Sequence, residues 1–193
     1  MTQEEKKAVA SEIIKNHVGF SLGAALIPVP GADLLAVSAV QLNMLRSLAK
    51  IYDVGFMDSL GKNIISAVVG GSAARLGASL VKAIPGVGTV IGELSMPVLS
   101  GASTFALGKV VARHFQHGGT LDDFDLKKAR KGYDSEMEAG KRMAEELARG
   151  RAPESTNPDD TMEKLLKIAE LKEAGILTDE EFKQLKQRLL AKI

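Results

Sequence analysis

The sequence contains no cysteine and no tryptophan, and only 4% of its residues are aromatic. Without cysteine, disulfide bonds, thiolate nucleophiles and thiolate metal sites are excluded. Because 45% of the 193 residues are nevertheless hydrophobic, the core has to consist of aliphatic side chains, alanine and glycine. Such a composition suits helices that approach one another closely, and the length allows one domain plus a small module.

The sequence also lacks a charge excess of either sign, since 25 Lys and Arg residues face 24 Asp and Glu residues. No overall field would draw the chain to nucleic acid, so nucleic-acid binding is not expected. The three histidines, His17, His114 and His117, have neither the HExxH spacing nor a flanking carboxylate cluster. We therefore predict no metal site and no cofactor, and the N-terminus lacks the pattern of a secretory signal.

No segment alternates between polar and apolar residues with a period of two, so we predict an all-α fold without strands. Breakers at 28–31 and 85–88 separate the expected helices. Asp33 is placed to cap a helix that runs to about Tyr52 and is closed by Gly55. Further helices are expected over about 57–82 and on to His114, the latter kinked near Pro97.

Changes in composition divide the chain, which is apolar and rich in small residues up to about 111 and densely charged from 114 onward. A stretch of Gly, Pro, Ser and Thr near 150–159 is typical of a linker. We expect a charged N-terminal helix (1–17), a glycine-rich apolar helical domain (18–116), a charged helical segment (117–149), the linker (150–159) and a helical hairpin (160–193).

Two long stretches are almost free of charge: 18–45 contains only Asp33, and 83–108 contains only Glu93. Each approaches the ~20 residues that a membrane-spanning helix needs. Both are interrupted by proline and glycine, however, and a central carboxylate costs ~2.5–3.5 kcal/mol on insertion. Neither stretch is predicted to be a simple span.

Small residues recur at every fourth position in two sets, which predicts flat helix faces that pack closely. Membrane helices favour such faces, and a tightly packed soluble bundle is the alternative. The residues we assign to helix packing or assembly are Gly70, Ala74, Ala78, Gly88, Gly92, Thr104 and Gly108.

Three ionisable residues lie within the apolar domain, and a buried charge is rarely left without a partner. One hypothesis pairs Arg75 with Glu93 across the turn at 85–88, with Asp33 joining them or capping its own helix. The alternative is capping by Asp33 and solvent exposure of the other two.

From 122 to 149 acidic and basic clusters alternate, which indicates a solvated helix with ion pairs between near neighbours worth ~0.2–0.5 kcal/mol each. A basic lipid-binding patch is the alternative for the lysines and arginine between 127 and 131. No nucleotide-binding or catalytic motif is complete: the glycines of 86–92 have no preceding strand, and no P-loop or nucleophile elbow occurs. We expect no enzymatic activity.

The C-terminal 30 or so residues are predicted to form two amphipathic helices, the first ended by Gly175 as its left-handed residue. Thr178 and Glu181 then form a capping box that starts the second. The apolar face should pack on another copy or on the main domain. The residues that we expect to build it, besides Gly175 at the turn, are Leu166, Leu171, Ile176, Leu177, Phe182, Leu185 and Leu189.

The segment Ala174–Phe182, within 165–190, resembles the short C-terminal domain known as SHOCT, and this resemblance implies oligomerisation or docking of a partner. The main domain resembles the YcjF-like helical family associated with bacterial GTPases. That second resemblance rests on Pro28, Pro30, Asp33, Gln41, Met44, Leu48, Ala49, Tyr52, Pro85, Gly86 and Gly88. It implies membrane association, but 1–17 is too short for a GTPase domain, so any nucleotide hydrolysis would belong to a partner.

These features together predict a non-catalytic, self-assembling helical scaffold at the cytoplasmic side of the bacterial inner membrane. Its candidate partners are membrane lipid and a GTPase or another protein. The alternative is a soluble cytoplasmic homo-oligomeric adaptor that docks a GTPase or another partner. Nucleic-acid binding through the basic residues 127–131 ranks last.

Overall fold

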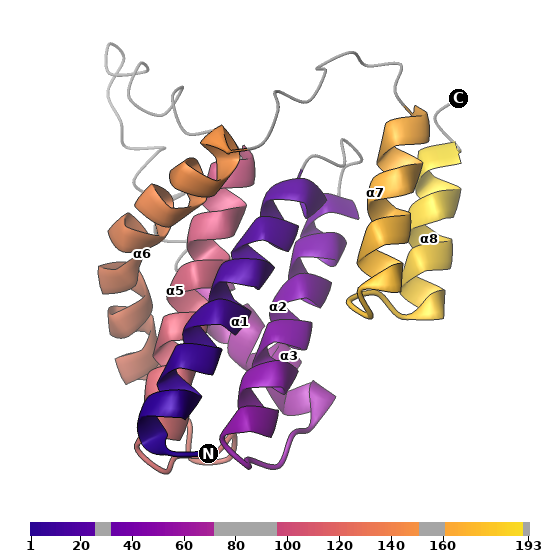
Figure 1. Cartoon of the computed structure of the whole chain (residues 1–193). Helices are drawn as coiled ribbons and strands as arrows, with labels where there is room; N and C mark the ends of the chain where they lie inside the picture. The colour runs from indigo at the N-terminus through magenta and orange to yellow at the C-terminus, as the bar shows by residue number, and fades with distance from the viewer. Residues whose placement is uncertain (26–31, 72–95, 151–160, 191–193) are drawn as a thin grey trace.

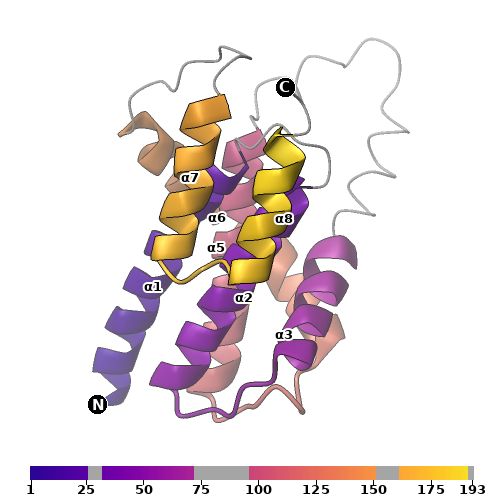
Figure 2. The same ribbon diagram turned by 90° about the vertical axis from the view of Figure 1, so that its right-hand side faces the viewer.

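The computed structural model describes residues 1–25, 32–71, 96–150 and 161–190, and these residues form helices joined by turns, with no strand among them (Figure 1). This confirms the all-α prediction. Within the described ranges, α1, α2, α5 and α6 lie side by side as a bundle, and the α7–α8 hairpin lies against one side of it in both views (Figures 1 and 2).

The first two helices begin and end at local signals that stabilise their termini. α1 covers Gln3–Ala24, and Thr2 and Glu5 form a capping box at its start. α2 covers Ala32–Ile51, so that Asp33 lies in its first turn. The chain leaves α2 through Asp53, which has φ 61°. Gly55 was expected to close this helix, but the left-handed residue is an aspartate two positions earlier, a residue type that tolerates this conformation.

The helix expected over 57–82 is not a uniform α-helix in its described part. α3 covers Asp58–Ile65 with Met57 as its N-cap residue, and a π-helical segment, η1, follows over Ser66–Gly70. Arg130 of the later helix α6 donates a hydrogen bond from Nε to the carbonyl oxygen of Ala67, 2.8 Å away. The wider turn is thus bonded to α6, and the remainder of 57–82 lies outside the described residues.

The next two helices form the most extensive packing contact in the described part of the chain. α5 covers Met96–Gln116, with Pro97 in its first turn, where proline is tolerated, and α6 covers Leu126–Arg149. The carboxylate of Asp125 caps α6 by accepting from the amides of Lys127 and Lys128 at 2.9 and 3.0 Å. Residues 126–149 therefore begin as a helix at a defined cap.

α6 is amphipathic rather than solvated all round, because Ala129, Tyr133 and Ala144 are buried in the same core as α1, α2 and α5. Gly140 permits the closest contact: a Cβ atom at this position would lie 2.6 Å from the carbonyl oxygen of Ala102 on α5. The boundaries that we expected at 17/18 and 116/117 therefore fall inside α1 and within one shared core.

The hairpin consists of α7, Thr161–Glu173, and α8, Asp179–Leu190. Gly175 has φ 67°, and Thr178 and Glu181 form the predicted capping box, with the amide of Glu181 donating to Thr178 Oγ1 at 3.2 Å. Its apolar residues pack against α1 and α2 of the same chain in a second hydrophobic cluster. Of the two expected positions for this face, the structure has the one on the main domain.

Candidate functional site

Five polar side chains form a hydrogen-bonded network inside the apolar core. The hydroxyls of Ser21 on α1 and Thr104 on α5 lie 2.7 Å apart. Gln41 on α2 donates from Nε2 to Ser103 Oγ at 3.2 Å and to Thr104 Oγ1 at 3.3 Å. Tyr133 on α6 donates its hydroxyl to Ser103 Oγ at 2.8 Å. All four helices of the bundle are thus joined at one level.

This network is shielded from solvent, since Ser21 and Thr104 have no exposed area and Gln41 is 2% exposed. Burial raises the pKa of the Tyr133 phenol to about 12, against the smaller lowering effect of its bond to Ser103. Buried polar groups that are paired fix the relative position of the elements they join, because a slipped arrangement leaves them unpaired. We assign the network to holding the helix register.

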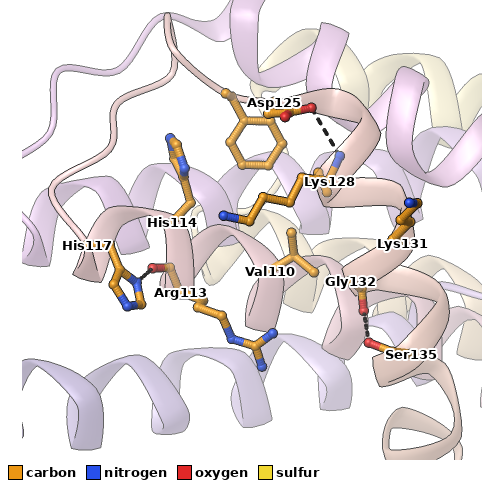
Figure 3. Close-up of a pocket in the computed structure, with 11 residues that line it drawn as sticks. Val110, Arg113, His114, His117, Asp125, Lys128, Lys131, Gly132 and Ser135 are labelled. Carbon is orange, nitrogen blue, oxygen red and sulfur yellow. Dashed lines mark hydrogen bonds between the residues drawn. The ribbon is translucent and has the colours of Figure 1, made fainter.

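A cleft of about 480 Å³ lies where the end of α5 meets the start of α6, at the end of the bundle that carries the N-terminus (Figures 1 and 3). Both helices and the turn between them supply its walls. The lining residues are Val110, Arg113, His114, His117, Phe124, Asp125, Lys128, Ala129, Lys131, Gly132 and Ser135.

The lining of this cleft is basic, with three permanent cations, Arg113, Lys128 and Lys131, against the single carboxylate of Asp125. The hydrogen bond from the Lys128 amide lowers the pKa of the Asp125 carboxyl and outweighs the opposing effect of desolvation. The Lys127 amide and the two lysine charges lower this pKa further. Its charge is therefore engaged at the start of α6. Figure 3 shows the Lys128 side chain extended across the cleft toward His114.

The two histidines of the cleft are held at the end of α5. His114 Nε2 lies 2.8 Å from the carbonyl oxygen of Thr120 and 3.1 Å from Asp123 Oδ1. Its ring also meets the edge of Phe124, with centroids 4.9 Å apart. His117 Nδ1 donates to the carbonyl oxygen of Arg113 at 2.6 Å. These contacts fix the wall opposite α6.

A third polar feature links the bundle to the hairpin. His17, which is 7% exposed, has Nδ1 at 2.7 Å from the carbonyl oxygen of Ile13 and Nε2 at 3.0 Å from Asn43 Oδ1. Asn43 in turn donates from Nδ2 to the carbonyl oxygen of Gly175 at 2.9 Å. Both neighbours of the imidazole are oxygen atoms, one on the backbone and one on a side chain. These hydrogen bonds connect α1, through Asn43 on α2, to the turn of the hairpin.

The predicted packing residues differ in whether the structure shows them in a contact between helices. Thr104 is fully buried in the polar network, and a Cβ atom on Gly108 would lie 2.8 Å from Ile14, so this stripe packs helices of the same chain. Gly70 is exposed in η1, with no described atom within 4 Å of an added Cβ atom. The four others, Ala74, Ala78, Gly88 and Gly92, lie outside the described residues.

The proposed charge pairing also lies largely outside the described residues, because Arg75 and Glu93 fall in 72–95. Asp33 is in the first turn of α2, where a carboxylate is favoured near the helix N-terminus, and its side chain is not among those described. Most of the hairpin residues are placed as expected: Leu171, Ile176, Leu177, Leu185 and Leu189 are buried and Phe182 packs against them. Leu166 is the correction, since it is 59% exposed and points away from the apolar contact.

Sequence analysis named Thr104 as a packing residue but missed the other residues of the buried network and the hydrogen bonds that link the bundle to the hairpin. Ser21, Gln41, Ser103 and Tyr133 are separated by long intervals and carry no local motif, so only tertiary packing brings them together. One sequence feature indicated the cleft, namely the basic run near 127–131 that follows Asp125. Its other wall, at Arg113 and His117, was not connected with that run.

None of the helices in the described ranges combines the length with the apolar character that crossing a membrane requires. Within those same ranges, no group of three His, Asp or Glu side chains is arranged to hold a metal ion.

Comparison with known proteins finds two relationships. The family described as "Domain of unknown function (DUF697)" matches residues 1–133, which run from α1 into α6. Magnetosome membrane protein 22 of Magnetospirillum gryphiswaldense (strain DSM 6361 / JCM 21280 / NBRC 15271 / MSR-1) is 36% identical over 141 residues, covering 70% of this chain and 72% of that protein. No solved structure matches the chain.

Proposed function

The chain belongs to the DUF697 family, and we propose that it is a non-catalytic helical scaffold associated with the bacterial inner membrane at its cytoplasmic side. The observation that carries this proposal is the similarity to Magnetosome membrane protein 22, which extends over most of both chains. Association with a membrane is therefore the property that we carry over to this chain.

We further propose that the scaffold assembles through its C-terminal hairpin, which resembles the SHOCT domain. In the described chain the hairpin covers small side chains of α1 and α2, among them Ala24, Ala36 and Ala39. The same contact can form between two copies when the hairpin of one packs on the bundle of the other, because exchange of an identical element needs no new surface. Each exchanged hairpin adds one link to the assembly.

Exchange of the hairpin is tested with single cysteines, since the chain has none of its own. Asn43 contacts the backbone of Gly175 across the hairpin contact. The variants are therefore Asn43→Cys and Ala174→Cys, since Ala174 is exposed next to this contact and the left-handed Gly175 is kept. Mixing the two single variants under oxidation should give a disulfide-linked dimer. The double variant, which can close within one chain, is the control. Internal closure of the double variant with no dimer from the mixture would contradict exchange.

Membrane association is tested by fractionating cells that express the full chain. We expect the protein in the membrane fraction at low salt. Release by a high-salt wash would indicate electrostatic association, and resistance to an alkaline wash would indicate insertion. Recovery in the soluble fraction at low salt would count against the proposal. It would favour the alternative of a soluble homo-oligomeric adaptor that docks a GTPase or another protein, which rests on the YcjF-like resemblance alone.

A further inference from the structure

The basic cleft between α5 and α6 is a concave site on the outside of the bundle, with a volume of about 480 Å³. We propose that it binds the phosphate-bearing headgroup of an anionic phospholipid. The inference rests on the proposed membrane association and names the residues and the lipid chemistry through which it would occur. Its ligand class follows from the charge, the apolar lining and the position of the cleft.

The cleft is lined by more cations than acidic groups. Arg113 is held by Glu136, with Nη2 and Oε1 2.5 Å apart. Asp125 is engaged by the first amides of α6. Lys128 and Lys131 line the cleft, both are exposed, and neither forms an ion pair within the part of the chain that the structure describes. Two exposed ammonium groups are thus available to an anion.

The backbone and the apolar lining add to this preference. The start of α6 at Leu126 carries the positive end of a helix dipole of 24 residues next to the two lysines. Val110 and Ala129 are buried at the cleft wall, and the ring of Phe124 is partly buried beside them. A ligand with an anionic group joined to an apolar part fits such a lining better than a bare anion does.

The shape of the site argues for a lipid headgroup over nucleic acid. The net charge of the chain is only +1, so the chain has no overall positive field that would draw a nucleic-acid backbone to it. The cleft lies at one end of the bundle, where one side of the molecule can face a membrane (Figure 1). Lysines near an anionic membrane surface each contribute favourably to binding.

The test is vesicle binding by the full chain, with Lys128→Gln/Lys131→Gln as the cleft variant. The matched control is Lys183→Gln/Lys186→Gln on α8, which removes two exposed lysines at the same spacing from the hairpin. On phosphatidylcholine vesicles that contain phosphatidylglycerol, the cleft variant should bind about thirtyfold more weakly than the wild type, corresponding to about 1 kcal/mol per lysine. The control variant should bind like the wild type, and circular dichroism should show both to be folded.

Each other outcome overturns the assignment. Equal loss in both variants would mean that binding follows total charge, and equal binding by all three proteins, or no binding, would exclude the cleft. Tighter binding of soluble glycerol phosphate than of vesicles would identify a soluble phosphate ester as the ligand, and preferential binding of duplex DNA or RNA would replace the lipid. Fractionation of cells separates the two proposals: wild type in the membrane fraction together with an unaffected cleft variant leaves membrane association standing and removes the cleft.

Discussion

The hydroxyl of Tyr133 on α6 donates a hydrogen bond to Ser103 Oγ on α5 across 2.8 Å, inside a core that is otherwise almost wholly aliphatic. Ser103 in turn accepts from Gln41 on α2. Through this bond the charged helix α6, which also packs on the bundle through alanine, glycine and partly buried larger apolar side chains, is fixed in position along α5. The hydrogen bond thus gives the most charged helix of the bundle a defined position against the apolar helices.

Removing this hydroxyl should destabilise the bundle modestly. Tyr133→Phe keeps the ring in place and deletes the donor, while Ser103 Oγ still accepts from Gln41. We expect a loss of about 1 kcal/mol in the free energy of unfolding, measured by chemical denaturation. Tyr52→Phe, at a half-buried ring near the surface, is the control and should change stability by less. An equal effect of the two substitutions would remove the special role of Tyr133.

Stability should fall at alkaline pH because of the same residue. The pKa of Tyr133 is about 12 in the folded protein and near the ordinary tyrosine value of 10.0 in the unfolded chain. Between these values the unfolded chain has lost the proton that the folded protein retains, so rising pH favours unfolding, by up to about 1.4 kcal/mol per pH unit. Denaturation between pH 10 and 12 should show this slope, and Tyr133→Phe should reduce it. An unchanged slope in the variant would contradict the assignment.

Close contact between α5 and α6 depends on Gly140. A methyl group at this position would meet backbone atoms of Ala102, which cannot move aside as a side chain can. Gly140→Ala should therefore cost about 1–3 kcal/mol of stability. Gly70→Ala, where no described atom is near, should be neutral or gain up to about 1 kcal/mol from helix propensity. Thermal unfolding of both variants checks the contrast, and similar midpoints would argue against a close contact.

The packing of the hairpin on the bundle can be tested by comparing two leucine substitutions on α7 in the full chain. Leu171 is 1% exposed and Leu166 is 59% exposed on the same helix. Leu171→Ala should weaken the hairpin contact by about 2–5 kcal/mol. Leu166→Ala should change stability by no more than about 0.5 kcal/mol. Amide hydrogen exchange over 161–190 reports the result, and equal protection in the two variants would mean that the hairpin does not dock through Leu171.

Much of the helical architecture could be predicted from sequence because its signals are local. Gly175, Thr178 and Glu181 mark the hairpin, and the absence of alternating patterns excluded strands. The π-helical segment at Ser66–Gly70 and the left-handed Asp53 were not predicted, since neither has a distinctive local pattern. Which face of α6 is buried and where the hairpin packs depend on contacts between distant segments.

The candidate cleft likewise combines a feature that is visible in the sequence with one that depends on contacts between distant segments. The basic run of α6 is visible in the sequence, and a lipid-binding patch was one of the two interpretations open for it. Arg113 lies in the last turn of α5 and His117 directly follows this helix, and only the turn at 117–125 brings them opposite Lys128. Periodicity within one helix carries no information about that neighbour.

The central claim, membrane association of the folded chain, is tested most directly by flotation of cell lysate through a density gradient at low salt. Large self-assembled particles sediment together with membranes in a simple fractionation, but they do not float in a density gradient. Flotation therefore separates membrane-bound protein from such particles. We predict that the wild-type chain rises with the membrane lipids. Wild-type protein that stays at the bottom of the gradient while the lipids float would contradict the claim.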